Sequence, residues 1–163
     1  MTQIGWTGHR PELFLDPDAA RARVDHLARE MASARRFLVG GQRGVDTWAA
    51  EAAHRLGVPF SVYLPLPADE FAADWTLDDR CALDATLGWA AEVQVVGGPT
   101  TDAAHTARNR VLGTSADLLV AVWTGTRGGG TAETIDFARA AGVPIREERL
   151  PGSATAPLTG RGI

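Results

Sequence analysis

The apolar run at residues 118–122 (Leu-Leu-Val-Ala-Val) constrains the fold of this chain more than any other feature. A strand with apolar side chains on both faces is typical of a parallel sheet, because helices cover both sides of such a sheet. The glycine-rich segment 124–130 follows the run at once, and a predicted helix at 131–141 follows the glycines. The run therefore predicts a buried strand that passes through glycines into a helix.

The same order of strand, turn and helix recurs along the chain. Strands are predicted at 3–6, 36–39, 59–64, 92–96, 118–122 and 143–146, and helices at 16–34, 45–56, 76–89, 102–114 and 131–141. This alternation predicts a single Rossmann-like α/β domain over residues 1–150, with a mostly parallel sheet and helices on both faces. Segment 65–74 is predicted to be a loop. Residues 151–163 hold little to bury and are predicted to form a flexible tail.

Composition excludes several classes of protein. No apolar run approaches the ~20 residues of a membrane span, and no secretory signal is visible at the N-terminus, so we expect a cytoplasmic protein without a membrane partner. The single cysteine, Cys81, cannot by itself form an intrachain disulfide or a cysteine-based zinc site. The net charge of −4 and the absence of lysine argue against a large nucleic-acid-binding face. The acidic stretch 69–84 is interpreted as a solvated loop and helix start, and no metal or redox cofactor is expected.

The glycines cluster directly after predicted strands, where open parallel sheets bind ligands. The strongest candidate is the phosphate-binding segment Gly128, Gly129, Gly130 and Thr131. Free backbone amides, the helix dipole and the Thr131 hydroxyl are the groups that hold phosphate at a helix N-terminus. The alternative is a flexible loop in which Thr131 only caps the helix. The chain has neither the P-loop lysine nor a dinucleotide-binding fingerprint.

Two further junctions carry candidate nucleotide-binding residues, which are Gly8, His9, Arg10, Gly41, Gln42, Gly44 and Asp46. Gln42 and Asp46 are candidates for contact with a sugar or base, unless the segment is a tight turn with Asp46 starting the next helix. Arg10 is a candidate for anion contact. His9 is a candidate for acid–base chemistry, and the alternative for it is an ordinary hydrogen-bonding role.

Several of these segments resemble a known superfamily. Residues 7–11, 41–52 and Asp74-Trp75 resemble the YpsA-like branch of the SLOG superfamily. Arg108-Asn109, Ser115-Ala116-Asp117 and Gly129-Gly130-Thr131 are similar to its LOG branch, the cytokinin-activating phosphoribohydrolases. The resemblance covers the chain up to about Arg146. Members of the superfamily include hydrolases, nucleotide sensors and DNA-processing proteins.

The resemblance implies a nucleotide ligand, a homodimer or larger assembly, and two catalytic residues. The LOG arginine carries over to Arg108, with the same spacing to Asp117. The LOG glutamate of Gly-Thr-x-x-Glu falls on Thr134, and Glu133 stands one residue earlier. The first hypothesis is hydrolysis of the N-glycosidic bond of a nucleoside 5′-monophosphate, with Arg108 and Glu133 catalytic. The alternatives are a non-catalytic nucleotide sensor and a DNA-processing protein.

Overall fold

A computed structural model of the chain, described here for residues 2–154, contains one six-stranded sheet in which every strand pairs in parallel. The strand order is β4-β3-β2-β1-β5-β6. The strands are β1 (Gln3–Gly8), β2 (Arg36–Val39), β3 (Phe60–Leu64), β4 (Glu92–Val95), β5 (Leu118–Trp123) and β6 (Ile145–Arg149). The helices are η1 (Pro11–Leu13), α1 (Pro17–Glu30), α2 (Val45–Leu56), α3 (Ala68–Phe71), α4 (Leu77–Trp89), α5 (Thr101–Ser115) and α6 (Gly130–Ala140).

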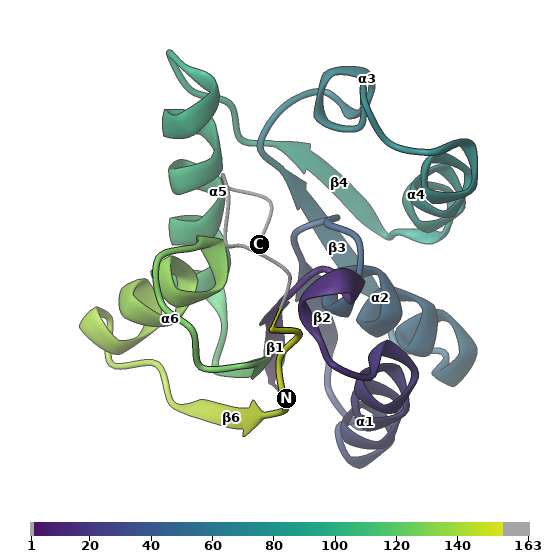
Figure 1. The fold of residues 1–163 in the computed structure, drawn as a ribbon, viewed down its shortest axis with the longest axis vertical. Coiled ribbons are helices and arrows are strands. Elements are labelled where there is room, and N and C mark those ends of the chain that lie inside the picture. Colours follow the sequence, from purple (N-terminus) through teal and green to yellow (C-terminus); the bar gives the residue numbers. More distant parts are fainter. Residues whose placement is uncertain (1, 155–163) are drawn as a thin grey trace.

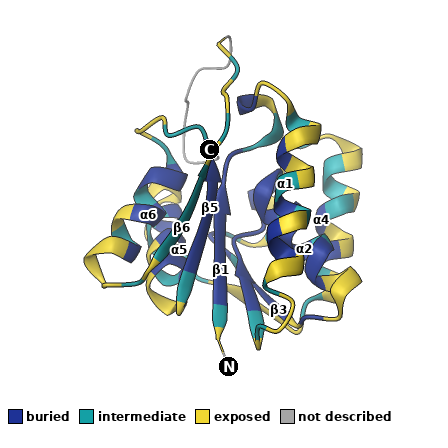
Figure 2. Ribbon diagram, turned by 90° about the horizontal axis from the view of Figure 1, so that it is seen from below, coloured by how far each residue is buried: buried dark blue, intermediate teal, exposed yellow. Residues whose placement is uncertain are grey.

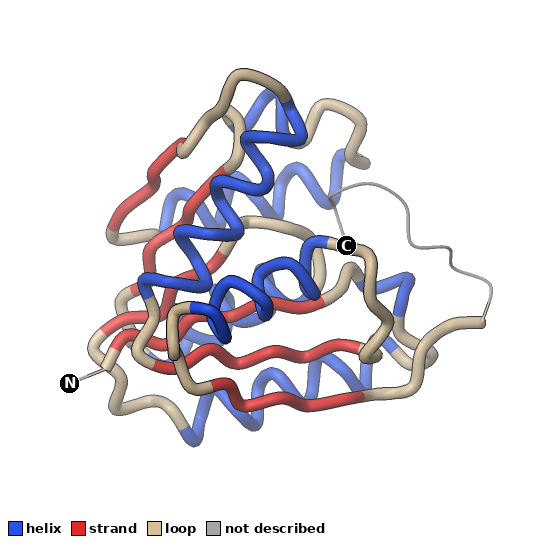
Figure 3. The backbone as a smooth tube through the Cα atoms, turned by 90° about the vertical axis from the view of Figure 1, so that its left-hand side faces the viewer, coloured by secondary structure: helices blue, strands red, loops and turns tan. Residues whose placement is uncertain are grey.

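Helices cover the sheet on both sides and give the protein three layers. Helices α5 and α6 lie on one side of the sheet and α1, α2 and α4 lie on the other (Figures 1 and 2). The strands form one twisted layer between them (Figure 3). In β5, Leu119 and Ala121 pack in the cluster that contains α6 residues, whereas Val120 and Val122 pack in the cluster of α1 and α2. The predicted double burial of this strand and the Rossmann-like α/β architecture are therefore confirmed.

Local signals set several helix ends. Asp16 caps α1 by accepting a hydrogen bond from the Ala19 amide at 3.0 Å. Thr76 and Thr100 cap α4 and α5 in the same way, at 3.2 and 3.1 Å. Gly57 closes α2 in the left-handed conformation, at φ 71°. These caps satisfy backbone groups that a helix end leaves without partners.

The structure differs from several predicted boundaries, most clearly in the following elements. Strand β1 runs on to Gly8, because β5 continues to pair with it as far as Val122. Helix α1 ends at Glu30, four residues before the predicted end, and β6 begins at Ile145 rather than at 143. The short helix α3 lies inside the segment predicted to be a loop. None of the described helices is both long and apolar enough to cross a membrane.

The first residues of the predicted tail pair with the chain near η1. The Leu15 amide donates to the Pro151 carbonyl at 2.9 Å, and the Ser153 amide donates to the Leu13 carbonyl at 2.9 Å. The rest of the predicted tail, residues 155–163, lies outside the described residues.

Candidate functional site

The strand order reverses between β1 and β5, and the candidate residues gather at that point. From β1 the chain builds outward through β2, β3 and β4, then returns to the other side of β1 as β5. The segments that follow β1 and β5 leave toward opposite faces of the sheet, and in open α/β sheets the ligand crevice lies at the carboxyl ends of such a pair of strands. His9 directly follows β1 and Thr124 directly follows β5. The His9 Nε2 and Thr124 Oγ1 atoms lie 3.0 Å apart, so they bridge the two strand ends.

His9 is a buried connector at this crevice. Its side chain is 1% exposed, and the Thr131 Oγ1 atom lies 3.5 Å from its Nδ1. The Thr124 hydroxyl also lies 3.0 Å from Thr126 Oγ1, so His9, Thr124 and Thr126 form one hydrogen-bonded chain. Burial, and then the charge of Arg10, lower the pKa of His9 to about 4. His9 is thus neutral near pH 7 and ties β1, β5 and α6 together.

The junction after β2 is pressed against the junction after β1. Gly44 has φ 86°, and a Cβ atom there would stand 2.3 Å from the His9 carbonyl oxygen, so glycine is required at this position. The Val45 amide donates to the same His9 carbonyl at 3.3 Å. Gly8 is equally crowded, because a Cβ atom there would stand 2.3 Å from the Val122 carbonyl oxygen. These contacts bring two predicted binding segments together.

Hydrogen bonds that involve Asp46 and Gln42 hold this junction against the first turn of α2. The Gln42 amide donates to Asp46 Oδ2 at 3.2 Å, and the Thr47 hydroxyl donates to the Gln42 carbonyl at 2.8 Å. Both Gln42 and Asp46 are buried. Burial raises the pKa of Asp46 to about 6, while the Arg108 charge and the Gln42 and Gly40 amides act to lower it.

Arg108 extends from α5 toward the carboxyl end of β2. It is 3% exposed, and its Nη1 donates to the Gly40 carbonyl and, at 3.4 Å, to the Tyr63 carbonyl. Its Nε donates to Asn109 Oδ1 at 2.9 Å. Burial lowers the pKa of Arg108, while the charges of Asp46 and Glu133 act to raise it. Arg108 therefore carries a positive charge to the junction that Asp46 belongs to.

Asn109 joins the two predicted catalytic residues, and the sequence did not single it out as a site residue. While its Oδ1 accepts from Arg108, its Nδ2 donates to Glu133 Oε1 at 3.0 Å. The Thr106 hydroxyl donates to Glu133 Oε2 at 3.3 Å. Glu133 is thus held against α5 by both of its oxygens. The pair Arg108-Asn109 belongs to the segments that resemble the LOG branch. The contact between Asn109 and Glu133, by contrast, becomes apparent only in the folded structure.

The junction after β5 is exposed, whereas Asp46 and Arg108 at the junction after β2 are buried. A cavity of about 150 Å³ lies beside the latter junction and is lined in part by Arg43, Gly44 and Thr47. Helix α6 begins at Gly130, so the amides that follow Gly129 face its N-terminal end without intrahelical acceptors. A cavity of about 370 Å³ lies beside this end, lined by Arg127, Gly128, Gly129, Ala132, Glu133, Asp136 and Phe137. Thr131 does not line the cavity, because its side chain is buried against His9.

The structure places the predicted residues in two groups. Gly128, Gly129 and Glu133 face the cavity beside α6, and Arg127, which the sequence did not single out, stands beside them. Gly130 and Thr131 are buried at the start of α6. The junctions after β1 and β2 hold Gly8, His9, Gly41, Gln42, Gly44 and Asp46, and Arg108 reaches the Gly40 carbonyl there. Arg10 makes a 3.5 Å ion pair with Glu12. Thr134, at the position of the LOG glutamate, is buried and donates to the Gly130 carbonyl at 2.9 Å.

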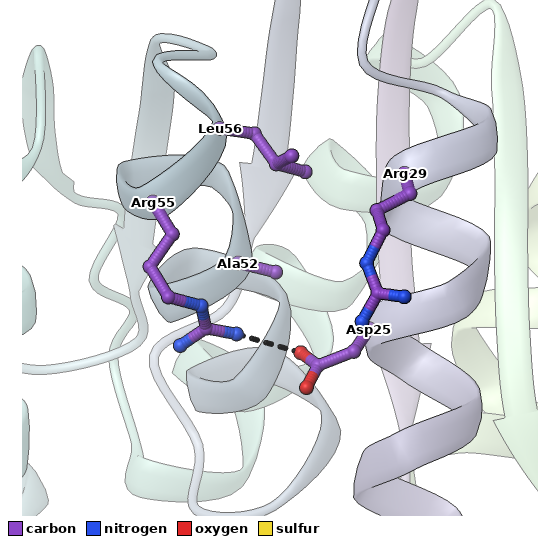
Figure 4. Close-up of a pocket in the computed structure, with 5 residues that line it drawn as sticks. All are labelled: Asp25, Arg29, Ala52, Arg55 and Leu56. Carbon is purple, nitrogen blue, oxygen red and sulfur yellow. Dashed lines mark hydrogen bonds and ion pairs between the residues drawn. The ribbon is translucent and has the colours of Figure 1, made fainter.

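A second cavity, of about 210 Å³, lies between α1 and α2 and away from every predicted site residue (Figure 4). Asp25 and Arg55 cross it with an ion pair of 2.7 Å, and Arg29 stands on the α1 side. Its remaining lining residues are Ala52 and Leu56. The ion pair occupies this groove, and no predicted chemistry points to it.

No family model and no curated protein sequence matches the chain. Solved structures do resemble it. DNA processing protein A (DprA) from Streptococcus pneumoniae gives a TM-score of 0.67 at 18% identity, over 94% of this chain and 51% of that one. DprA from Helicobacter pylori, described for its single-stranded DNA binding mode, also gives 0.67 at 18% identity, over 93% and 67%. The molybdenum cofactor carrier protein from Chlamydomonas reinhardtii gives 0.59 at 22% identity, over 89% and 74%.

This chain spans about half the length of the pneumococcal DprA chain. Similarity at this level of identity concerns the fold alone. The chain therefore shares the Rossmann-like α/β fold of these structures.

Proposed function

We propose that the protein binds a nucleoside 5′-monophosphate in the crevice between the ends of β1 and β5. The observation that carries the proposal is the exposed start of α6, the helix that follows β5, beside a cavity of about 370 Å³. A helix N-terminus offers free amides and a positive dipole end, and each favours an anion. The phosphate would lie on the amides of residues 128–131.

Arg127 supplies the positive charge for this phosphate in our proposal. It lines the cavity, its side chain is 54% exposed, and its described partner is Asp136. A bound phosphate competes with that carboxylate for the guanidinium, because a phosphate presents more acceptor oxygens. Thr131 has a different role, since its hydroxyl faces His9 and so holds the start of α6 against the residue that follows β1.

The finer proposal is hydrolysis of the N-glycosidic bond. Water would bond to the ribose C1′ as the bond to the base nitrogen breaks, and the base would leave with a proton. The transition state has oxocarbenium character, which a fixed carboxylate stabilises. Glu133 lines the cavity, and Asn109 and Thr106 hold its carboxylate in one orientation. Arg108 acts on Glu133 through Asn109, which contacts both residues, and its positive charge partly offsets the negative charge of the Glu133 carboxylate.

A thermal-shift panel tests the binding proposal. We expect nucleoside monophosphates to raise the melting temperature more than the matching free nucleosides, because only the former carry the anion. Arg127→Ala should weaken the affinity for the monophosphate about tenfold. Arg139→Ala is the matched control, since Arg139 on α6 is as exposed as Arg127 but does not line the cavity. The absence of a shift with any mono-, di- or cyclic nucleotide would overturn the proposal.

Chromatography of the same mixtures tests hydrolysis. Release of free base identifies a hydrolase, whereas tight binding without release identifies a sensor. The double hydrogen bonding of Glu133 favours the sensor as the second candidate, because both carboxylate oxygens are already engaged. The fold similarity to DprA favours single-stranded DNA as a third ligand, and its test is a prediction below.

A further inference from the structure

Phe137 is the aromatic residue in the lining of the cavity beside α6, and neither the proposed phosphate site nor the proposed hydrolysis uses it. The other residues of that lining are small or charged. The Phe137 side chain is only partly buried. An aromatic ring in the wall of a polar cavity keeps apolar surface in contact with water, and a flat ligand laid on the ring removes that surface from water.

Helix α5 holds the Phe137 side chain in place. The Arg110 Cζ atom lies 4.9 Å from the centroid of the Phe137 ring, within the distance at which a cation is attracted to a ring face. Gly113 packs against the base of the same side chain, because a Cβ atom there would stand 3.3 Å from Phe137 Cβ. Arg110 does not line the cavity. The ring is therefore supported from α5 while part of it faces the cavity.

The cavity-lining residues of α6 follow one another in the order of the parts of a nucleotide. Glu133 and Phe137 are four residues apart, so their side chains share one face of the helix. Phe137 lies about 10 Å along the axis from the first residue of α6, and its side chain leans back toward that end. An extended mononucleotide covers this span. Free amides, a carboxylate and an aromatic ring thus match phosphate, ribose and base.

We propose that the base of the bound nucleotide stacks on the Phe137 ring, so that the protein recognises the flat face of the base and not its edge. This inference rests on the proposed nucleotide site. Every base has a π face, so stacking tolerates exchange of the groups at the base edge, and the larger ring system of a purine offers more contact than a pyrimidine. The expected ligand class is purine nucleoside 5′-monophosphates, with an amino or a carbonyl group on the base.

Calorimetric titration with matched ligands tests the inference. The probes are adenosine, inosine and cytidine 5′-monophosphates and ribose 5-phosphate, which keeps the phosphate and sugar but has no base. For wild type, we expect the adenosine compound to bind roughly five- to a hundredfold more tightly than ribose 5-phosphate, the range for one base stacked on an aromatic ring. The adenosine and inosine compounds should differ by less than about threefold, and the cytidine compound should bind more weakly than either.

Three variants separate the ring from its surroundings. Phe137→Leu keeps an apolar side chain but removes the ring, so the ratio between ribose 5-phosphate and the adenosine compound should fall to about three or less. Phe137→Trp keeps an aromatic face and should retain the wild-type ratio. Trp89→Leu is the matched control, because Trp89 is a partly exposed aromatic residue that stacks on His54 at 4.1 Å and does not line the cavity. Each ratio is measured within one protein, so a change in phosphate affinity or a partial loss of stability cancels.

The outcomes distinguish this inference from the proposed function. If wild type binds monophosphates and Phe137→Leu keeps the wild-type ratio, the base lies elsewhere and the inference is wrong, while the phosphate site stands. Equal binding of ribose 5-phosphate and the adenosine compound to wild type also overturns it, because the base then makes no contact. A difference above about tenfold between the adenosine and inosine compounds contradicts it as well, because the base is then read at its edge. If neither a monophosphate nor ribose 5-phosphate binds wild type, the proposed function is overturned and this inference with it.

Discussion

The glycine-rich junctions after β2 and β5 share one sequence pattern but have opposite environments. The junction after β2 is closed, with Asp46 and Arg108 both nine-tenths buried or more around Gly40. The junction after β5 is open, with Arg127 and Asp136 each more than half exposed beside the cavity. The sequence pattern of strand, glycines and helix therefore predicts where charged residues gather, but not whether they will be buried or exposed.

Helix α5 contacts both junctions. It sends Arg108 to the closed junction and Asn109 to Glu133 at the open one. Neighbouring residues on a helix point about 100° apart, so one turn of α5 serves both junctions. Helix α5 therefore links the two junctions through its neighbouring residues Arg108 and Asn109.

The largest expected effect concerns the buried charge of the closed junction. Arg108→Ala should lower the free energy of unfolding by about 3 kcal/mol or more, because it leaves Asp46 buried beside an empty space and removes two hydrogen bonds to carbonyls. Arg127→Ala, at the open junction, should change it by less than about 0.5 kcal/mol. Urea denaturation measures both. Equal effects of the two substitutions would contradict the distinction between a closed and an open junction.

The next effect concerns catalysis at the open junction. If wild type releases base, Glu133→Gln should lower turnover about a hundredfold while binding survives, because the amide keeps the shape but not the charge. Asp136→Asn removes a charge from the same cavity and is the control. Should Glu133→Gln release base at the wild-type rate, the catalytic assignment is wrong, and Asp46 and Asp79 become the next candidates.

The two sides of the crevice also carry titrations of opposite sign. The pKa of His9 is lowered from 6.5 to about 4, so its contribution to stability is lost as pH falls through that window. The pKa of Asp46 is raised from 3.8 to about 6, so its contribution is present at low pH and is lost as pH rises through about 6. Between pH 4 and 6 the two contributions oppose each other in the wild type.

In a variant that lacks one of the two groups, the pH dependence due to the other group should become measurable. His9→Gln should make the free energy of unfolding fall with rising pH by about 1.4 kcal/mol per unit relative to wild type, and Asp46→Asn should have the opposite effect. Denaturation curves across this range provide the measurement. Parallel pH profiles for all three proteins would show that neither group is linked to folding.

The smallest expected effect is on DNA. With a net charge of −4 and no lysine, the protein should bind single- or double-stranded DNA more weakly than about 1 µM at physiological salt. Fluorescence anisotropy at two salt concentrations checks this. Sub-micromolar affinity with a steep salt dependence would favour a DprA-like role over the nucleotide site.

The sequence predicted the sheet well, because β5 is apolar on both faces and glycines punctuate the strand ends. Its errors lie where neighbours decide the local structure. Strand β1 continues to Gly8 only because β5 pairs beside it. Helix α3 has four residues, too few to leave a periodic pattern.

The site was predicted as a set of segments but not as an arrangement. Arg108 contacts the Gly40 carbonyl, 68 residues away, and Asn109 contacts Glu133, 24 residues away. No local pattern encodes such contacts. Thr131 was predicted to face a phosphate, whereas α6 begins one residue earlier and its hydroxyl faces His9.

A crystal structure of the protein with a nucleoside 5′-monophosphate tests the central claim most directly. We predict the phosphate on the amides of residues 128–131 and the ribose C1′ facing Glu133. A phosphate bound at the α1–α2 groove, or a ligand that leaves the start of α6 untouched, would contradict the proposed site.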